Sequence, residues 1–197
     1  MSLMEKFSKY QKREDNKPLS NELFKGKTLS IVNYDGWEMT HESDMVIILP
    51  YMKDKKSLLL RSEYVPTYRY RHNKDNNKDH QQFLTCVCGT MENGETPEQT
   101  IRRELYEEAG IILSSVKSLD IEDGVHLSKG NLAKYYCCII EIGNGEYKQT
   151  IAPGDGSKAE TLSRTIEIPV KDIDELIPTD IATKYLLTNF KLKYKDE

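Results

Sequence analysis

Three glutamates near the middle of the chain, Glu104, Glu107 and Glu108, have the spacing of one face of a helix. Like charges at this spacing weaken an isolated helix by roughly a few tenths of a kcal/mol per pair. A divalent cation reverses this effect, because Mg²⁺ and Mn²⁺ bind carboxylate, carbonyl and water oxygens in octahedral geometry. The adjacent Arg103 can also hold a carboxylate by a bidentate contact. The cluster by itself predicts either a cation site or a solvated acidic face.

The residues around this cluster predict the helix that must carry it. Thr96 is a suitable N-cap, Pro97 fits the first helical position, and Gln99 completes a capping box with Thr96. Gly110 can end the helix in a left-handed turn. An apolar stripe with a spacing of four residues must face a core, and it consists of Ile101, Leu105 and Ala109.

The spacing of the whole stretch from Gly89 to Ile111 is more specific than its acidic face. It fits the pattern G-x5-E-x7-R-E-U-x-E-E-x-G-U, in which U is a bulky aliphatic residue. Seven named residue types at roughly one in 15 each give a chance match on the order of one in 10⁸ per position. This pattern, here called the box, is the signature of the Nudix hydrolase family, and the chain is identified by it as resembling that family.

The resemblance implies a chemistry and a role for each matching residue. It implies hydrolysis of the pyrophosphate of a nucleoside diphosphate derivative by metal-activated water, with Mg²⁺ or Mn²⁺ as cofactor. By position, Glu104 and Glu108 resemble the principal metal ligands, and Glu107 a further ligand, direct or through water. The carbonyl of Gly89 or of its predecessor completes a site. Glu95 resembles the glutamate that pairs with Arg103 and orients the helix. The residues expected to act in the reaction are Arg103, Glu107, Glu108 and Glu160.

Within the family, the chain is most similar to the ADP-ribose pyrophosphatase type, which releases AMP and ribose 5-phosphate. That subfamily has N-terminal strands that commonly mediate homodimerisation, and residues 21–44 resemble them. Trp37 is placed to stack on adenine, or it is an ordinary hydrophobic anchor or dimer contact. The subfamily also uses a glutamate from a later loop to assist the attacking water. Here Glu160 is the first choice and Asp155 the second.

The polar stretch that follows the predicted strand at 58–61 is a candidate loop at the edge of the substrate site. We expect tyrosine to stack on a base and arginine to meet phosphate there. The alternative is a mobile surface insertion, because residues 73–80 contain no apolar side chain. The candidate substrate-binding residues, besides Trp37, are Arg61, Tyr64, Arg69 and Arg71.

Departures from the subfamily leave other functions open. Its Glu-Leu-Pro-Ala-Gly before the box reads Thr85-Cys86-Val87-Cys88-Gly89 here, and its Gln-Tyr-Arg reads Ser62-Glu63-Tyr64. The downstream Ser-Pro-Gly reads Ser128-Lys129-Gly130. Another nucleotide sugar or a dinucleotide is therefore an alternative substrate. A non-catalytic nucleotide-sensing module is a second alternative. A third, an isomerase of a diphosphate lipid precursor, is not favoured, because this sequence has no recognisable cysteine and glutamate pair for that reaction.

Local patterns divide the chain into a polar segment at 1–20, N-terminal strands at 21–44 and a Nudix domain at 45–197. We expect an α/β (α+β) fold, an α/β/α sandwich around a mixed sheet with a small N-terminal antiparallel strand subdomain. An Asp35-Gly36 turn predicts a hairpin, and residues 143–158 read as loop. A helical turn is expected at 169–177, and a last helix from Thr179 or Asp180 is expected to bury Ile181, Tyr185, Leu186 and Phe190. Strands are predicted at 28–34, 36–40, 45–52, 58–61, 83–88, 113–121, 131–142 and 164–168.

Composition narrows the class of protein. The 197 residues are 38% hydrophobic and 30% charged, as in soluble globular proteins, and the net charge of −4 does not favour nucleic-acid binding. No run of 18 apolar residues and no signal core is present, so we expect a cytoplasmic protein without a membrane partner. Cysteines at 86, 88, 137 and 138 lie in apolar strand-like runs and are expected to be reduced core residues rather than zinc ligands.

Overall fold

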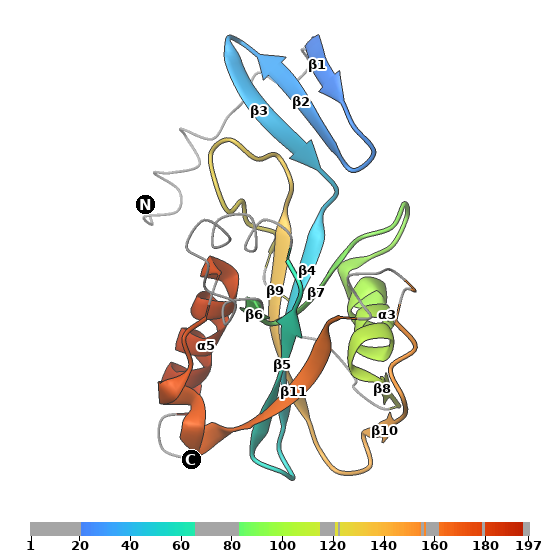
Figure 1. The fold of residues 1–197 in the computed structure, drawn as a ribbon, viewed down its shortest axis with the longest axis vertical. Helices are drawn as coiled ribbons and strands as arrows, with labels where there is room; N and C mark the ends of the chain where they lie inside the picture. The colour runs from blue at the N-terminus through green and yellow to red at the C-terminus, as the bar shows by residue number, and fades with distance from the viewer. Residues whose placement is uncertain are drawn as a thin grey trace, which may run out of the picture. The chain divides into compact units, whose positions relative to one another are not determined.

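The computed structural model describes residues 21–65, 83–114, 121, 123–154, 156, 162–178 and 180–194. The chain divides into two compact units, Met1–Glu42 with Lys129–Leu132, and Ser43–Ser128 with Ala133–Glu197. Figure 1 labels the helices and strands of both units. The second unit contains all the residues of the Glu104 cluster, and its sheet positions them.

The first unit is a small antiparallel sheet. Its strands β1 (Asn21–Lys25), β2 (Leu29–Tyr34) and β3 (Trp37–Glu42) pair in the order β1-β2-β3. The turn between β2 and β3 has positive φ at both Asp35 (51°) and Gly36 (83°), as the predicted hairpin requires. Thr40 bonds the segment at 129–132, because its N–H donates to the Gly130 carbonyl and its carbonyl accepts from Leu132. The predicted small N-terminal antiparallel sheet is thus confirmed.

A mixed sheet of six described strands forms the centre of the second unit. The order β11-β5-β4-β7 is antiparallel throughout, β6 pairs with β5, and β9 runs parallel to β4. The central strand β4 has seven consecutive buried residues, as a strand covered on both faces should. The strands are β4 (Met45–Met52), β5 (Ser57–Glu63), β6 (Phe83–Thr85), β7 (Val87–Thr90), β9 (Tyr135–Ile142) and β11 (Arg164–Pro169).

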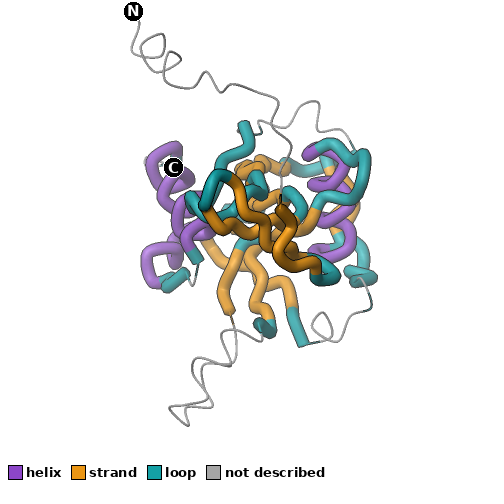
Figure 2. The backbone as a smooth tube through the Cα atoms, turned by 90° about the horizontal axis from the view of Figure 1, so that it is seen from above, coloured by secondary structure: helices purple, strands orange, loops and turns teal. Residues whose placement is uncertain are grey.

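Helices cover both faces of this sheet, α3 (Pro97–Ala109) on one and α5 (Ile181–Lys193) on the other (Figures 1 and 2). Alternate residues of β4 enter two separate cores: Ile47 and Leu49 pack in the core that contains α5. Val46 and Ile48 pack in the core that contains α3. This alternation is the side-chain period of a strand. The expected α/β/α sandwich around a mixed sheet is confirmed.

Several local predictions differ from the structure. The predicted loop at 143–158 contains a short strand, β10 (Tyr147–Gln149), which pairs with β8 (Ile111–Leu113). Leu113 therefore ends a strand rather than beginning one, and residues 115–120 of the predicted strand lie outside the described residues. The strand expected at 83–88 is interrupted at Cys86. The 3-10 helix η2 (Val170–Glu175) occupies the expected helical turn.

The buried face of α5 is also not the predicted one. Ile181 is 69% exposed and Tyr185 is 43% exposed, so the expectation that they are buried was wrong. Thr183, in the first turn, is buried instead, and its polar groups have partners. Its N–H and its hydroxyl donate to the two carboxylate oxygens of the N-cap Asp180, and its hydroxyl accepts the Cys86 N–H. The side chains that α5 does bury are Ala182, Thr183, Leu186, Leu187 and Phe190.

Two further observations concern cysteines and membranes. Cys86, Cys137 and Cys138 are buried, Cys88 is half-buried, and all four are free thiols. Burial raises the pKa of the Cys86 thiol well above its usual range.

Among the described residues, no helix has both the length and the apolar character needed to cross a membrane.

Candidate functional site

Helix α3 forms as its local sequence dictates. Thr96 and Gln99 form the capping box, with the Gln99 N–H donating to Thr96 Oγ1 at 3.3 Å and the Thr96 N–H to Gln99 Oε1 at 2.8 Å. Gly110 ends the helix in the left-handed region at φ 65°. Ile101 and Leu105 are fully buried against the sheet. The apolar stripe therefore fixes the rotation of α3 and directs Glu104 and Glu108 toward β7.

Arg103 holds three glutamates of this stretch. Its Nε and Nη2 each lie 3.0 Å from one oxygen of Glu95, which is the bidentate pair expected from the sequence. Its Nη1 donates to Glu104 Oε1 at 2.6 Å and to Glu107 Oε2 at 3.0 Å. The Arg103 hydrogen bonds lower the pKa of Glu95 to about 2, and the Glu95 partner raises the pKa of Arg103. The loop before α3 and the acidic face of α3 thus form one ionic network.

Glu104 is the most enclosed member of this network. It is 7% exposed and packs directly over Gly89, in the part of β7 that pairs with β4. A Cβ at position 89 would overlap the Glu104 carboxyl group. The glycine that opens the box is therefore required for space, and it allows a carboxylate to lie flat against the strand backbone.

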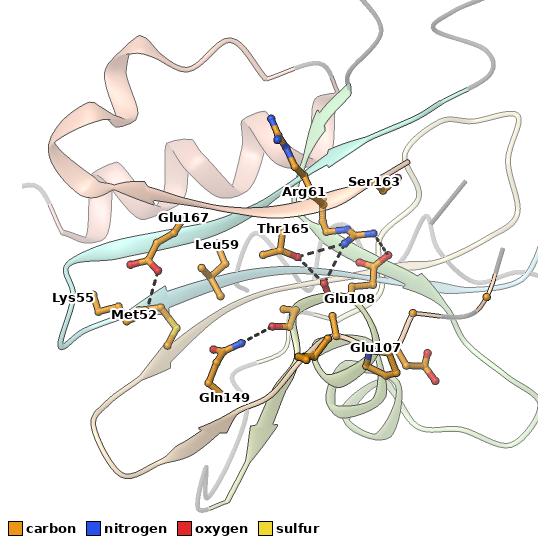
Figure 3. A pocket seen from close by; sticks show the side chains of 17 residues that line it. Met52, Lys55, Leu59, Arg61, Glu107, Glu108, Gln149, Ser163, Thr165 and Glu167 are labelled. Atoms are coloured by element: carbon orange, nitrogen blue, oxygen red, sulfur yellow. Dashed lines mark hydrogen bonds and ion pairs between the residues drawn. The ribbon is translucent and has the colours of Figure 1, made fainter. Parts of the chain in front are cut away.

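Glu108 is held from the sheet rather than by Arg103 (Figure 3). Its carbonyl accepts hydrogen bonds from Thr165 Oγ1 at 2.6 Å and from Arg61 Nη1 at 3.1 Å. Its carboxylate accepts the Cys88 N–H at 3.3 Å, and its other oxygen lies 3.6 Å from Arg61 Nη2. Backbone and side chain of Glu108 are therefore both fixed by strand residues.

The remaining carbonyls at the end of α3 also have partners. The Glu107 carbonyl accepts from the Gly154 N–H at 3.0 Å, and the Ala109 carbonyl accepts from Gln149 Nε2 at 2.9 Å. The Thr150 N–H donates to the Gly110 carbonyl at 2.8 Å. Carbonyls at a helix C-terminus need such partners because the helix itself supplies none. The segment at 149–154 and the strands therefore anchor the end that carries Glu107 and Glu108.

Two cavities meet at Glu107 and Glu108. The first, here the acidic cleft, measures about 690 Å³, and its charged lining residues are Glu63, Glu92, Arg103, Glu104, Glu107 and Glu108. The second, here the side cavity, also measures about 690 Å³. Its lining includes Glu107 and Glu108, further charged residues such as Lys55, Arg164 and Glu167, and apolar residues such as Met52, Leu59 and Ile151. Cavities of this size suit part of a nucleotide. The two carboxylates lie where a charged group in the cleft would join a larger group in the side cavity.

The comparison with family models agrees with this geometry. The model described as the NUDIX domain matches residues 41–188, which is most of the chain and includes the whole acidic cleft. The chain belongs to the NUDIX family. Members of this family are typically metal-dependent pyrophosphohydrolases that act on nucleoside diphosphate derivatives. Comparison with curated proteins found no match.

The donor set of the cleft fits the divalent metal that NUDIX enzymes generally use. Among its described lining residues, five glutamates face a single cation, Arg103. Within the part of the chain that the structure describes, no three acidic, histidine or cysteine groups converge on one point as a closed cage. Mg²⁺ does not need one, because it keeps several waters and binds through a few carboxylates and substrate phosphates. Glu104, Glu107 and Glu108 are the residues that would hold it.

The structure brings together the box residues of the sequence prediction. Gly89, Arg103, Glu104, Glu107 and Glu108 all line the acidic cleft, and Glu95 joins them through Arg103. Their roles as metal ligands and in the reaction remain predictions.

The predicted substrate residues are distributed differently. Arg61 lines the side cavity, although its side chain is only 5% exposed. Tyr64 follows β5, and its N–H donates to Ser163 Oγ at 3.2 Å. Trp37 belongs to the first unit and is 64% exposed. Four of the predicted residues lie outside the described residues, namely Arg69, Arg71, Asp155 and Glu160.

The site residues predicted from the sequence did not include Glu63 and Thr165. Glu63 lines the acidic cleft and follows Arg61 by two positions on β5, so the strand period places both on one face. That spacing was a usable signal. Thr165 pairs with Arg61 across the β11-β5 ladder, and no local pattern indicated this pairing.

Proposed function

We propose that this NUDIX protein cleaves the pyrophosphate bond of ADP-ribose to AMP and ribose 5-phosphate. The observation that carries a pyrophosphatase function is the row of Glu104, Glu107 and Glu108 in the acidic cleft, with Glu107 and Glu108 where the cleft meets the side cavity. A diphosphate held in the acidic cleft would place an attached nucleoside or sugar in the side cavity. The size of the side cavity supports a substrate with a large group on the diphosphate.

The reaction adds one water across the P–O–P bridge. The attacking oxygen bonds to one phosphorus, the bridging oxygen leaves with the other phosphate, and the water proton passes to a base. When bound, Mg²⁺ or Mn²⁺ neutralises the diphosphate and lowers the pKa of a coordinated water. We propose Glu160 as the residue that assists this water. Arg103 keeps Glu104 and Glu107 oriented, since one guanidinium nitrogen bonds both carboxylates.

Two features support ADP-ribose over other derivatives. The N-terminal antiparallel sheet resembles the strands expected of the ADP-ribose type, and its Trp37 is exposed and thus accessible for stacking on adenine. We also propose a homodimer through these strands and a cytoplasmic location. Light scattering of the full chain would test the dimer, and a monomer at all concentrations would contradict it.

A substrate panel tests the proposed activity. The full-length protein with Mg²⁺ is incubated with ADP-ribose, other nucleotide sugars and dinucleoside polyphosphates, and the products are separated by chromatography. We expect ADP-ribose to have the highest kcat/KM and to give AMP and ribose 5-phosphate in equal amounts. We expect Glu108→Gln to lower kcat by about 100-fold or more, as loss of a metal-holding group does.

Glu98→Gln is the matched control, because Glu98 lies on the same helix, is exposed, and pairs with Arg102 away from the cleft. It should behave as wild type. A higher kcat/KM for another derivative would replace ADP-ribose but keep the pyrophosphatase activity. Tight calorimetric binding of a nucleotide without cleavage of any compound would replace the enzyme by a nucleotide sensor.

A further inference from the structure

Arg61 occupies a position that packing alone does not explain. It lies within the sheet on β5, its side chain is 5% exposed, and it faces the end of α3. A buried guanidinium carries a large desolvation cost, and an apolar residue of similar size is often at least as stabilising. A charge at this position therefore indicates a requirement for what it contacts.

Arg61 contacts Glu63 and Glu108, which line the acidic cleft, and Thr165, which bonds the Glu108 carbonyl. Nη1 donates to the Glu108 carbonyl at 3.1 Å and to Thr165 Oγ1 at 3.4 Å. Nη2 lies 3.6 Å from Glu108 Oε1, and Nε lies 3.6 Å from Glu63 Oε1. The planar fork of arginine is what allows one side chain to reach a carbonyl and two carboxylates at once. Lysine would keep the charge but not this set of contacts.

Thr165 acts on the same carbonyl as Arg61. Its hydroxyl accepts from Arg61 and donates to the Glu108 carbonyl at 2.6 Å, so that carbonyl has two donors from two adjacent strands. The last turn of α3 contains no basic residue. Arg61 thus also supplies the positive charge that favours a helix C-terminus.

Four of the five cleft glutamates contact one of two arginines. Arg103, inside the box, bonds Glu104 and Glu107. Arg61, outside the box, contacts Glu108 and Glu63 at 3.6 Å, which is longer than a close charge-assisted hydrogen bond. It can orient Glu108 without neutralising it, because its charge is shared with Glu63.

We propose that Arg61 and Thr165 are positioning residues that fix Glu108, through its carbonyl and its carboxylate, for binding of the divalent cation. This rests on the proposed function in one respect, namely that Glu108 holds a metal. Arg61 then acts on the reaction through Glu108 and not by contact with substrate phosphate, in line with its burial.

The test measures Mn²⁺ binding to the full-length protein without nucleotide, from the EPR signal of free Mn²⁺. Arg61→Lys keeps the charge, and Thr165→Val removes only the hydroxyl donor. Both should weaken Mn²⁺ binding and lower kcat by about tenfold or more, as loss of groups that orient metal ligands does. KM should stay within about twofold, because in this proposal both side chains act through Glu108 and not on the substrate. Thr165→Ser, which keeps the hydroxyl, should recover most of the affinity.

Arg102→Lys is the matched control, because Arg102 is next to the site in sequence but bonds Glu98 on the outer face of α3. It should leave Mn²⁺ binding and kcat unchanged. Unchanged Mn²⁺ affinity in Arg61→Lys and Thr165→Val would overturn the proposal, whether KM rises, as for a phosphate contact, or only Tm falls, as for a purely structural role.

The wild-type protein separates this proposal from the proposed function. Absence of Mn²⁺ binding to wild type would overturn the positioning role. Mn²⁺ binding that weakens in both variants, together with no cleavage of any nucleotide derivative, would keep the positioning role and reject the hydrolase. Cleavage by the wild-type protein, together with unchanged Mn²⁺ affinity in both variants, would keep the hydrolase and reject the positioning role.

Discussion

Gly89 and Glu104 are in direct contact, and the contact is possible only because Gly89 has no side chain. The Glu104 carboxyl group lies over the backbone of β7 at this residue, and Arg103 Nη1 holds it there at 2.6 Å. The backbone of β7 and a side chain of α3 therefore pack against each other without room for a methyl group between them.

We predict that Gly89→Ala displaces the Glu104 carboxylate. The added methyl group overlaps the Glu104 carboxyl group, which Arg103 already holds in place. We expect a loss of roughly 1–3 kcal/mol in the free energy of unfolding, as for other overpacked sites. Mn²⁺ affinity should fall by about tenfold or more, because a ligand is displaced. Urea denaturation and EPR titration measure the two effects.

Gly130→Ala is the control for this substitution, because a Cβ there meets no atom within 4 Å. Its stability and Mn²⁺ affinity should match those of wild type. A Gly89→Ala protein with wild-type Mn²⁺ affinity would show that Glu104 is not needed for metal binding.

We predict that Glu95 titrates far below ordinary glutamates. Its pKa falls from 4.5 to about 2, mainly because Arg103 donates two hydrogen bonds to the ionised form. The folded state therefore favours the charged form, and the contribution of this pair to stability is full above the ordinary pKa. It is lost as the pH falls from about 4.5 to about 2. Carboxyl carbon NMR of Glu95 against pH measures this value.

Arg103→Met should raise the pKa of Glu95 toward its ordinary value, since the principal cause of the shift is removed. Arg102→Met should leave it low, because Arg102 bonds Glu98 instead. An ordinary pKa for Glu95 in the wild-type protein would show that the pair does not persist in solution.

We predict that Thr183→Val destabilises the protein, because it removes a hydrogen bond between α5 and the backbone at Cys86, between β6 and β7. The buried Thr183 hydroxyl accepts the Cys86 N–H at 2.9 Å and donates to Asp180 Oδ2 at 2.6 Å. Valine leaves a buried N–H without its partner, which costs roughly 1–3 kcal/mol. Thermal and urea unfolding should both report this loss.

Thr188→Val is the control, because the Thr188 hydroxyl is exposed and bonds only its own helix at Lys184. Its stability should lie within about 0.5 kcal/mol of wild type. Equal stabilities of the two variants would show that the Cys86 N–H finds another partner.

The sequence was most informative where partners are close in the chain. The capping box of Thr96 and Gln99 and the left-handed Gly110 are decided within one or two helical turns, and both are present. The buried face of α3 follows from periodicity in the same way. Local rules were insufficient for α5, where a hydroxyl bonded to Asp180 and Cys86 is buried and Ile181 is exposed.

Spacing along the chain was enough to place Glu104, Glu107 and Glu108 in one row, beside an arginine and on a helix. The contacts of Arg61 and Thr165 with the Glu108 carbonyl, and the position of Glu63 in the same cleft, follow from the assembled sheet. Periodicity tells which face of a strand is buried but not which strand lies beside it. That choice depends on how the sheet assembles, and it brings to Glu108 residues from 47 and 57 positions away.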